Sequence, residues 1–375
     1  MRRSFLTRFA SFHNTTNPPA ADALESQTDN RPNPGRSPDL PSRSISSDGS
    51  LLGPLTVYSH RAMACDFEIS LNETDTAREE ILDVFDLIDR EEESLSVFRP
   101  TSLLSRINML AAEMDVGVPS GLFEQLKICR SLWEETDGAF DITSSVLWKL
   151  WGFAKGEGRV PTNLEISSAL KKVGMQHVIL NEENQTVAFD LAGVEINFGA
   201  IGKGFALDRA ASFLTESSLE NYLIHGGMSS ALARGGRVED RIQTCDGSFR
   251  RCWSIGVADP IEPGQRLATL RLVDEAIGTA GSGRQYFFHR GKRFSHIIDP
   301  KTGHPSTGIL SATVITPDAT RADALSTAFF VMGVDATVKF AEKHPDDRIL
   351  LVLETDARKR EIVTLNMDNS QFRLE

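Results

Sequence analysis

The feature that most constrains the fold is the order of strand-like and helix-like segments in the second half of the chain. Short runs rich in apolar and β-branched residues follow one another there, with few helical patterns between them. These runs cover residues 222–224, 253–257, 267–272, 311–316 and 349–353. Strands that arrive in series argue for an α+β fold over a doubly wound parallel sheet. We expect a mixed or antiparallel sheet with flanking helices.

Three segments carry helix signals. Residues 76–94 place apolar side chains about one helical turn apart, with acidic residues between them. A second helix is expected to start at Ser120 as its N-cap and to end at Gly138. A third is expected over residues 203–217, entered from a short strand at residues 194–198.

The amino-terminal part differs in composition from the remainder. Residues 1–50 are rich in Ser, Pro, Asn and Asp and show almost no apolar periodicity. Such a segment buries too little apolar surface to offset the entropy lost on ordering, so we expect it to be disordered. No further linker is evident, and residues 51–375 are predicted to form one compact domain.

Composition excludes several classes of function. The 375 residues carry a net charge of −12, from 52 acidic and 40 basic residues, which argues against a nucleic-acid partner. The four cysteines lack the spacing of a zinc site, and reduced thiols are expected. No stretch approaches the roughly 20 apolar residues of a membrane span, and the first residues lack the apolar core of a secretory signal. We therefore expect no membrane span and a cytoplasmic location.

The densest group of polar residues in special geometry lies at residues 295–305. An apolar strand end runs there into an Asp-Pro-Lys-Thr-Gly turn, which presents His296 and Asp299 at its mouth. A histidine near neutral pKa is the usual proton-transfer group. The alternative is that Asp299 only caps the turn and His296 is a satisfied core residue.

Two other segments are candidates for binding a phosphorylated ligand. Asp323 and Thr327 lie four residues apart, so their oxygens fall on one helical face and could bind Mg²⁺. Residues 197–204 hold three glycines and Lys203 between a predicted strand and a helix, where backbone can approach a phosphate. Asp323 could equally favour the first helical turn through the helix dipole. The glycine spacing matches neither a Walker A loop nor a Rossmann loop.

Taken together and in order, the motifs resemble those of the ApbE family. The matching blocks are TDGAFDIT at 136–143, LWGF at 150–153, the Gly-rich loop, Gly226-Gly227, the segment 253–260, HIIDPKTGHP at 296–305 and ADALSTAFFVMG at 322–333. The resemblance covers the chain from about residue 55 to near its end.

The resemblance implies an FAD:protein FMN transferase that binds FAD and Mg²⁺, cleaves the diphosphate with release of AMP, and transfers FMN to a Ser or Thr hydroxyl of an acceptor protein. It implies that the Ala200 carbonyl and the side chains of Asp323 and Thr327 ligate Mg²⁺. His296 would act near the incoming hydroxyl as base or orienter. The positions that match the family's FAD pocket are Met63, Phe98, Asn108, Ala139, Phe140, Asp141, Asn197, Lys203 and Ile298.

The chain departs from the family pattern at several of these blocks. Met228 stands where the family has the Asp of GGD, and Asn197 replaces another Asp. Ala64 replaces the Gly of Met-Gly-Thr, Phe98 a Tyr, and Ala280 the Ser of TSG. Two of these changes remove negative charge near a phosphate site. An FAD-binding protein without catalysis, an FAD pyrophosphatase that forms FMN and AMP, and an interaction-only protein are therefore alternative functions.

Overall fold

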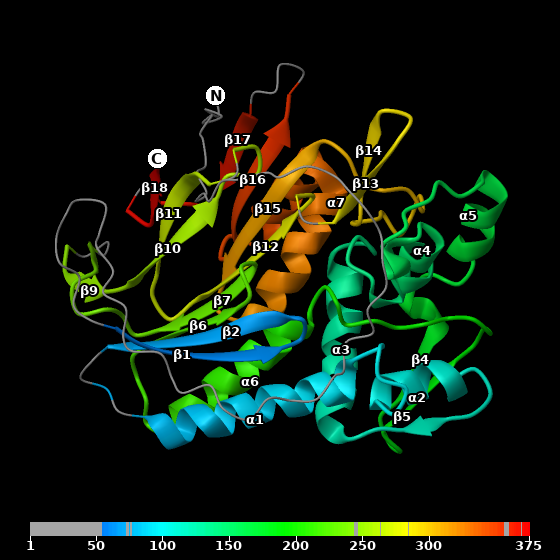
Figure 1. Cartoon of the computed structure of the whole chain (residues 1–375), viewed down its shortest axis with the longest axis horizontal. Coiled ribbons are helices and arrows are strands. Elements are labelled where there is room, and N and C mark those ends of the chain that lie inside the picture. The colour runs from blue at the N-terminus through cyan, green and yellow to red at the C-terminus, as the bar shows by residue number, and fades with distance from the viewer. Residues whose placement is uncertain are drawn as a thin grey trace, which may run out of the picture.

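The computed structural model describes residues 55–72, 75, 77–243, 247–262, 264–283, 285–355, 360–368 and 370–375. The segment 1–50, which we expected to be disordered, lies outside the described residues. Figure 1 shows one large sheet with helices packed on it, a smaller sheet, and a group of short helices and strands at the side.

The large sheet has eight strands in the order β1-β2-β6-β7-β12-β15-β16-β17. Every neighbouring pair is antiparallel, which confirms the α+β prediction. The strands are β1 (Leu55–Ala62), β2 (Cys65–Asn72), β6 (Tyr222–Gly226), β7 (Ser230–Arg234), β12 (Ala276–Gly281), β15 (Ile309–Thr316), β16 (Arg348–Glu354) and β17 (Arg360–Leu365). The sheet joins strands from both ends of the described chain, while the number of domains stays a prediction.

Three long helices cover one face of this sheet: α1 (Arg78–Leu95), α6 (Gly202–Glu216) and α7 (Ala319–Lys343). Alternate residues of β2 and β6, among them Ile69 and Ile224, are fully buried against α1 and α6. Burial of such side chains contributes roughly 1.5–3 kcal/mol each. This apolar layer fixes where the amino-terminal ends of α6 and α7 lie, and the candidate site is built there.

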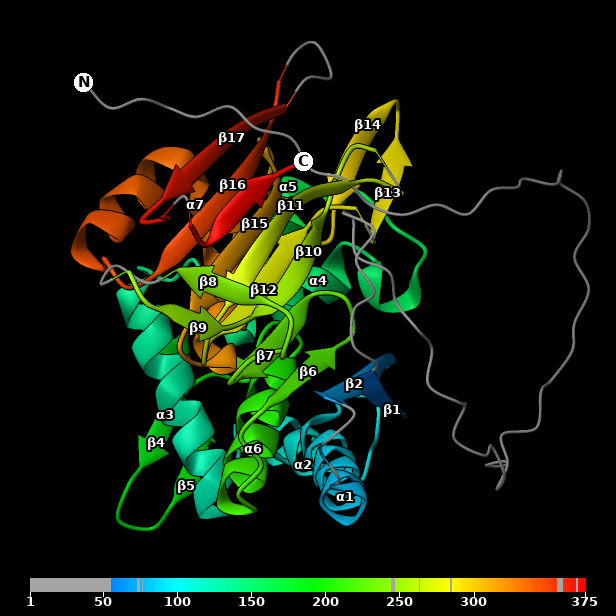
Figure 2. The same ribbon diagram turned by 90° about the vertical axis from the view of Figure 1, so that its left-hand side faces the viewer.

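Helix α7 reverses direction in its middle. Gly333 has φ 73° and ψ −177°, outside the helical region, and the rings of Phe329 and Phe340 pack 4.9 Å apart on either side of it. Figure 2 shows the resulting turn at the left-hand side. Among the described helices only α7 is long and apolar enough to cross a membrane, and half of its most apolar window is buried inside the protein. Because each of its two arms is shorter than the roughly 20 residues of a span, α7 is a core element here.

The other face of the large sheet is covered by a three-stranded sheet in the order β10-β11-β18. These strands are β10 (Trp253–Ala258), β11 (Arg266–Leu272) and β18 (Phe372–Leu374). Buried side chains from β10 and β11 pack on the outward face of the large sheet. The small sheet ends at β10, and Figure 2 shows it lying in front of β12 with β1 and β2 below it.

The remaining elements stand mainly beside the sheet, at the right of Figure 1. They comprise α2 (Leu103–Leu110), α3 (Ser120–Glu135), α4 (Ser145–Leu150), α5 (Asn163–Leu170), three short 3₁₀ turns (Ile142–Ser144, Phe153–Lys155 and Met175–His177), and the strands β3 (Val116–Gly117), β4 (Val178–Asn181) and β5 (Thr186–Phe189). Two hairpins complete the set, β8 (Arg241–Gln243) with β9 (Phe249–Arg251) and β13 (Tyr286–His289) with β14 (Lys292–Ser295).

The sequence-based elements need two corrections. Pro119, and not Ser120, is the N-cap of α3, and no side-chain cap bond forms there. Residues 194–198 belong to no strand. Their backbone is held by a side chain instead, since the Asn108 amide accepts from Ile196 N at 2.8 Å and donates to Ile196 O at 2.9 Å. The predicted helices and the five strand runs of the second half are otherwise confirmed within a few residues.

Candidate active site

Asp323 is the centre of the candidate site. It lies in the first turns of α7 and is 4% exposed. Its Oδ2 accepts from the Gly204 amide at 2.8 Å and its Oδ1 from the Ser230 hydroxyl at 2.6 Å. Burial raises the pKa of this carboxyl, opposed by the charge of Lys203 and by the two hydrogen bonds. A buried carboxylate of this kind needs such partners to stay ionised.

Two glycines allow the start of α7 to approach its neighbours closely. A Cβ on Gly204 would lie 2.4 Å from the Ala319 carbonyl oxygen, and one on Gly278 would lie 2.4 Å from backbone atoms of Ala322. No larger residue fits either position without displacing backbone. The glycine-rich loop and β12 are thereby packed directly against the helix that carries Asp323.

Asp208 of α6 fixes the same helix start. Its two carboxylate oxygens accept from the amides of Ala319 and Thr320, each at 2.8 Å. These amides have no partner inside the helix, and a carboxylate at a helix amino terminus is favoured by the helix dipole. Asp208 therefore holds α6 and α7 in register at the site.

Lys203 supplies the positive charge nearest to Asp323. Its Nζ lies 3.9 Å from Asp323 Oδ2, and its side chain is about one-fifth exposed. The charge of Lys203 is the largest influence that lowers the pKa of Asp323. Since Lys203 opens α6, its ammonium group and the first amides of that helix together favour an anion at this point.

The oxygen donors around Asp323 suit a hard divalent cation. The Gly204 amide donates to Asp323, and Ala200 precedes Ile201, the N-cap residue of α6, so the Ala200 carbonyl lies outside the hydrogen bonds of that helix. Thr327 Oγ1 lies 3.4 Å from the Asp323 carbonyl, one turn along α7. Each carboxylate oxygen of Asp323 retains a second lone pair. A carbonyl, a carboxylate and a hydroxyl form the all-oxygen set that Mg²⁺ takes, so these residues fit the ion.

His296 follows β14 and is held in one tautomer. Its Nδ1 lies 3.0 Å from the Gln285 carbonyl oxygen. Because a carbonyl only accepts, Nδ1 must carry the proton and Nε2 the lone pair. Burial lowers the pKa of His296, opposed by its bond to Gln285. The imidazole is therefore neutral at physiological pH and able to accept a proton.

The loop after α3 carries three of the predicted pocket residues, and the hydrogen bonds of the Asp141 carboxylate are made to this loop and to α3. Asp141 Oδ1 accepts from the amide and the hydroxyl of Thr143 at 2.7 and 2.6 Å, and Oδ2 accepts from Trp133 Nε1 at 3.0 Å. Burial raises the pKa of Asp141 to about 6. Ala139 and Phe140 are buried in the main core. Both carboxylate oxygens of Asp141 therefore accept hydrogen bonds that hold the conformation of the loop.

Some predicted pocket residues join this loop. Asn197 N donates to the Ile142 carbonyl at 2.8 Å, which sets the glycine-rich loop beside the segment after Asp141. The amide of Asn108 is occupied by Ile196, so Asn108 positions backbone.

Other predicted residues lie apart from Asp323 or have no contact with it. Ile298 is buried against Trp151 in a separate apolar cluster. Met63 packs against the core beneath α1, and its amide donates to Glu92 at 2.7 Å. Phe98 is 75% exposed. The structure thus places Lys203 beside the Asp323 carboxylate and Thr327 one helical turn after it, and leaves Phe98 at the surface.

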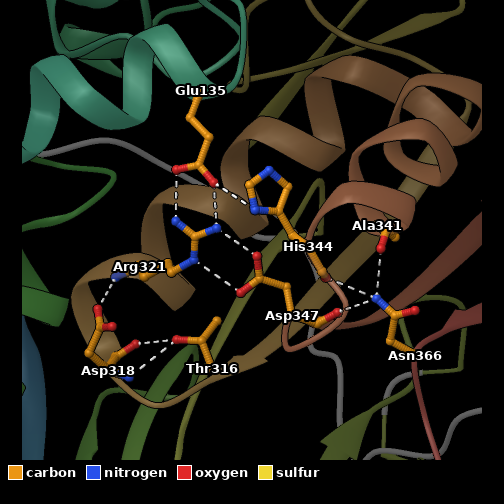
Figure 3. Close-up of polar contacts among 8 residues, drawn as sticks. All are labelled: Glu135, Thr316, Asp318, Arg321, Ala341, His344, Asp347 and Asn366. Atoms are coloured by element: carbon orange, nitrogen blue, oxygen red, sulfur yellow. Dashed lines mark hydrogen bonds and ion pairs between the residues drawn. The ribbon is translucent and has the colours of Figure 1, made fainter.

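A network of ion pairs links the start of α7 to the end of α3, as Figure 3 shows. The Arg321 guanidinium bonds to Glu135, the last residue of α3, at 2.8 and 2.5 Å. It also bonds to Asp347, just before β16, at 3.0 and 2.6 Å. Asn366 donates to three backbone carbonyls next to it, including that of Asp347. Arg321 therefore ties α7 to the loop that precedes Ala139.

Within the described residues, Glu135, His344 and Asp347 form the one cluster of ligand-type side chains close enough to share a metal ion. Arg321 already bonds to both of its carboxylates (Figure 3). Hydrogen bonds to these carboxylates raise the pKa of Arg321 further above its usual range. The guanidinium supplies the positive charge here, and the Asp323 group remains the better metal site.

A cleft of about 660 Å³ opens on the opposite face of the large sheet. It is lined by residues of β2, β6, β7 and β12, by the turn between β6 and β7, and by Ile255–Ala258 of β10. Ser230 also lines it, and the hydroxyl of Ser230 bonds to Asp323. The cleft therefore borders the β6-β7 hairpin, whose Ser230 hydroxyl reaches Asp323 on the opposite face of the sheet.

Sequence analysis missed three residues that organise this site, namely Ser230, Asp208 and Arg321. Asp208 is the last residue of the motif that begins with the glycine-rich loop, and this position could have identified it as a site residue. Ser230 and Arg321 gave none, since their partners lie 93 and 186 residues away in the chain.

Comparison with known proteins decides the family. The sequence profile of the ApbE family matches residues 63–351. The chain belongs to the ApbE family. Among curated relatives, the FAD:protein FMN transferase of Haemophilus influenzae is 31% identical over 270 residues, which cover 70% of this chain and 75% of the relative.

Solved structures agree with this assignment. The ApbE protein of Thermotoga maritima superposes with a TM-score of 0.73 at 30% identity, covering 83% of this chain and 97% of that one. The flavin transferase ApbE of Vibrio cholerae superposes with a TM-score of 0.70 at 26% identity, again over 83% and 97% of the two chains. The ApbE fold thus extends over the described part of the chain that holds Lys203, His296 and Asp323.

Proposed function

We propose that this ApbE-family chain is an Mg²⁺-dependent FAD:protein FMN transferase, which attaches FMN to a Ser or Thr hydroxyl of an acceptor protein and releases AMP. The observation that supports it most is the buried carboxylate of Asp323. It accepts a hydrogen bond from the Gly204 amide, and the Lys203 ammonium group lies 3.9 Å from it. The family and its named transferases supply the reaction class.

The residues divide the work of phosphoryl transfer between them. The Lys203 ammonium group would bind diphosphate oxygens, and Asp323, Thr327 and the Ala200 carbonyl would hold Mg²⁺. The ion would neutralise charge on the diphosphate as the bond to AMP breaks. These groups are fixed by Gly204, Gly278 and Asp208 before substrate binds, so little reorganisation is needed during reaction.

His296 would accept the one proton that the transfer releases. The acceptor hydroxyl oxygen would bond to the phosphorus of the FMN half, the bond from that phosphorus to the AMP oxygen would break, and the hydroxyl proton would pass to Nε2 of His296. The Gln285 carbonyl keeps Nδ1 protonated, which leaves Nε2 free to accept. Products are the FMN phosphoester, AMP and a proton.

Met228 raises the alternative of an FAD-binding protein without catalysis, because the family's Asp is absent at that position. A pyrophosphatase would use water in place of the acceptor hydroxyl. Purified protein should be incubated with FAD with and without Mg²⁺, and AMP, FMN and protein-bound FMN separated by chromatography. AMP release that requires Mg²⁺ supports a catalyst, whereas bound and intact FAD overturns the proposal. A cytoplasmic location stays a prediction.

A further inference from the structure

The cleft behind Asp323 has an unusual wall. Four consecutive residues of β10, from Ile255 to Ala258, line it. In a strand, alternate side chains point to opposite faces, so consecutive residues line a cavity only when the strand presents its edge. Strand β10 is the terminal strand of its sheet and pairs only with β11 among the described strands. The cleft is therefore bounded by a free strand edge.

This edge lacks the usual protection against pairing. Edge strands in soluble proteins commonly carry lysine, proline or other charged residues, which prevent addition of another strand. The β10 sequence is WSIGVA, with no charge and no proline, and its one register shift lies at its end, between Val257 and Ala258. An open, uncharged edge that faces a cavity is a template for an extended peptide.

The dimensions match a short added strand. The four residues of β10 that line the cleft span about 13 Å at roughly 3.3 Å per residue. The floor of the cleft is the uncovered face of the large sheet, where Glu68 of β2 lies directly opposite His225 of β6. Gly227, Met228 and Ser229, in the turn after β6, also line the cleft.

The same cleft borders the hairpin of β6 and β7 that contacts the candidate metal site. Ser230 belongs to this hairpin and donates to Asp323 Oδ1 at 2.6 Å on the opposite face of the sheet, so the hairpin lies between the cleft and Asp323. A hydroxyl carried by a strand in the cleft would approach the diphosphate across this hairpin. We propose that the acceptor protein docks as an extended segment along the free edge of β10, and that the cleft between β10 and the β2-β6-β7 face is its binding site.

This inference rests on the proposed function for the identity of the occupant, and it adds the surface and the mode of binding. Backbone pairing supplies affinity with little demand on sequence, while the side chains of Glu68 and His225 select the residues that face the sheet. Since Asp66 pairs with Arg61 at 3.1 Å, Glu68 leaves the floor acidic, and acceptor segments with a basic residue facing it should bind best.

The test uses the full-length protein with FAD and Mg²⁺ and a panel of synthetic dodecapeptides, each with one central threonine. Flavinylated peptides are identified by the added mass of FMN. Hydrogen exchange of the β10 amides is then followed with the best peptide at saturation. We expect exchange in residues 254–258 to slow at least about tenfold.

A cleft-filling variant provides a second measurement. Glu68 is exposed on β2, so Glu68→Trp should fold and fill the cleft floor, while Glu68→Gln removes only the charge. We expect Glu68→Trp to reduce peptide flavinylation more than tenfold with FAD affinity unchanged, and Glu68→Gln to reduce it by less than threefold.

The outcomes separate this inference from the proposed function. Transfer to peptide with unaltered β10 exchange and a fully active Glu68→Trp variant overturns the docking site and leaves the transferase standing. Protection of β10 by a peptide that is never flavinylated supports the docking site and overturns the transferase. Neither protection nor transfer across the panel overturns both.

Discussion

The Ser230 hydroxyl donates a 2.6 Å hydrogen bond to Oδ1 of Asp323, so a residue of the sheet holds one oxygen of the buried carboxylate while the Gly204 amide holds the other. The two contacts fix the carboxylate from β7 and from α6. They leave on each oxygen a lone pair for a cation. Asp323 is thus oriented before any ligand arrives.

Replacing Asp323 by Asn should abolish Mg²⁺-dependent FAD cleavage. The amide keeps the shape but removes the charge and one acceptor, and we expect AMP release to fall at least about a hundredfold. Stability should change by no more than about 1–2 kcal/mol, because the buried carboxyl already has a raised pKa. AMP formation measured by chromatography, with urea unfolding as the control, tests this. Normal AMP release by a folded Asp323→Asn protein would remove Asp323 from the metal site.

Lys203 should set the pH range over which Asp323 is ionised. Its charge lowers the pKa of Asp323, while burial raises it. Loss of that charge in Lys203→Met therefore raises the pKa of Asp323 further, so the carboxylate becomes protonated at a higher pH as pH falls. We expect the acid limb of Mg²⁺-dependent AMP release to move to higher pH, and FAD affinity to drop.

The matched control is Lys203→Arg, which keeps the charge and should retain the wild-type acid limb. Rates are measured across pH at saturating Mg²⁺. An unchanged limb in Lys203→Met would show that Lys203 does not act on Asp323.

The sequence predicted the fold class because the apolar runs of β10, β11, β15 and β16 have strand length and little helical pattern between them. It misjudged residues 194–198, whose alternating Val194, Ile196 and Phe198 have the period of a strand. The partner there is the Asn108 side chain and not another strand, and no local pattern reveals it. The alternation of apolar and polar residues indicates which face of a segment is buried. It does not indicate which groups bond to the backbone of that segment.

The site was predictable only where its residues are close in sequence. The sequence motifs identify Lys203 and Asp323 as candidates, but the short distance between the two side chains results from the packing of α6 on α7. The exposure of Phe98 could not be predicted either, since an aromatic residue after a helix suggests a side chain that is buried or in contact with a ligand. Long-range packing decided both outcomes.

Arg321 should contribute strongly to stability. Arg321→Met would leave the Glu135 and Asp347 carboxylates facing each other, with Asp347 only 2% exposed. Removing one partner of a buried pair costs about 3–5 kcal/mol, and partial exposure of Arg321 reduces this to roughly 2–3 kcal/mol. Urea unfolding measures the loss. A loss below about 1 kcal/mol would mean that the network in Figure 3 is solvated and adds little.

The turn between β1 and β2 should be improved by glycine. Ala64 has φ 58°, the left-handed region, where an alanine costs about 1 kcal/mol relative to glycine. Ala64→Gly should therefore raise the free energy of unfolding by about 0.5 kcal/mol after the entropy of the unfolded chain is counted. Ala62→Gly, within β1, is the control and should destabilise. A lower midpoint in urea for Ala64→Gly would contradict the strain at this turn.

His296 should affect transfer much more than FAD binding. His296→Ala removes the proton acceptor, and we expect the FMN transfer rate to fall about 10²–10⁴-fold with the FAD dissociation constant changed less than about threefold. Because burial lowers the pKa of His296, the wild-type rate should persist below pH 6.5 and decline as pH falls through that lowered pKa. His296→Asn places an amide nitrogen at the position of Nδ1 and can still donate to the Gln285 carbonyl, but it cannot take up a proton at these pH values. Transfer at the wild-type rate by His296→Asn would make His296 a positioning residue, since a hydrogen bond alone would then suffice.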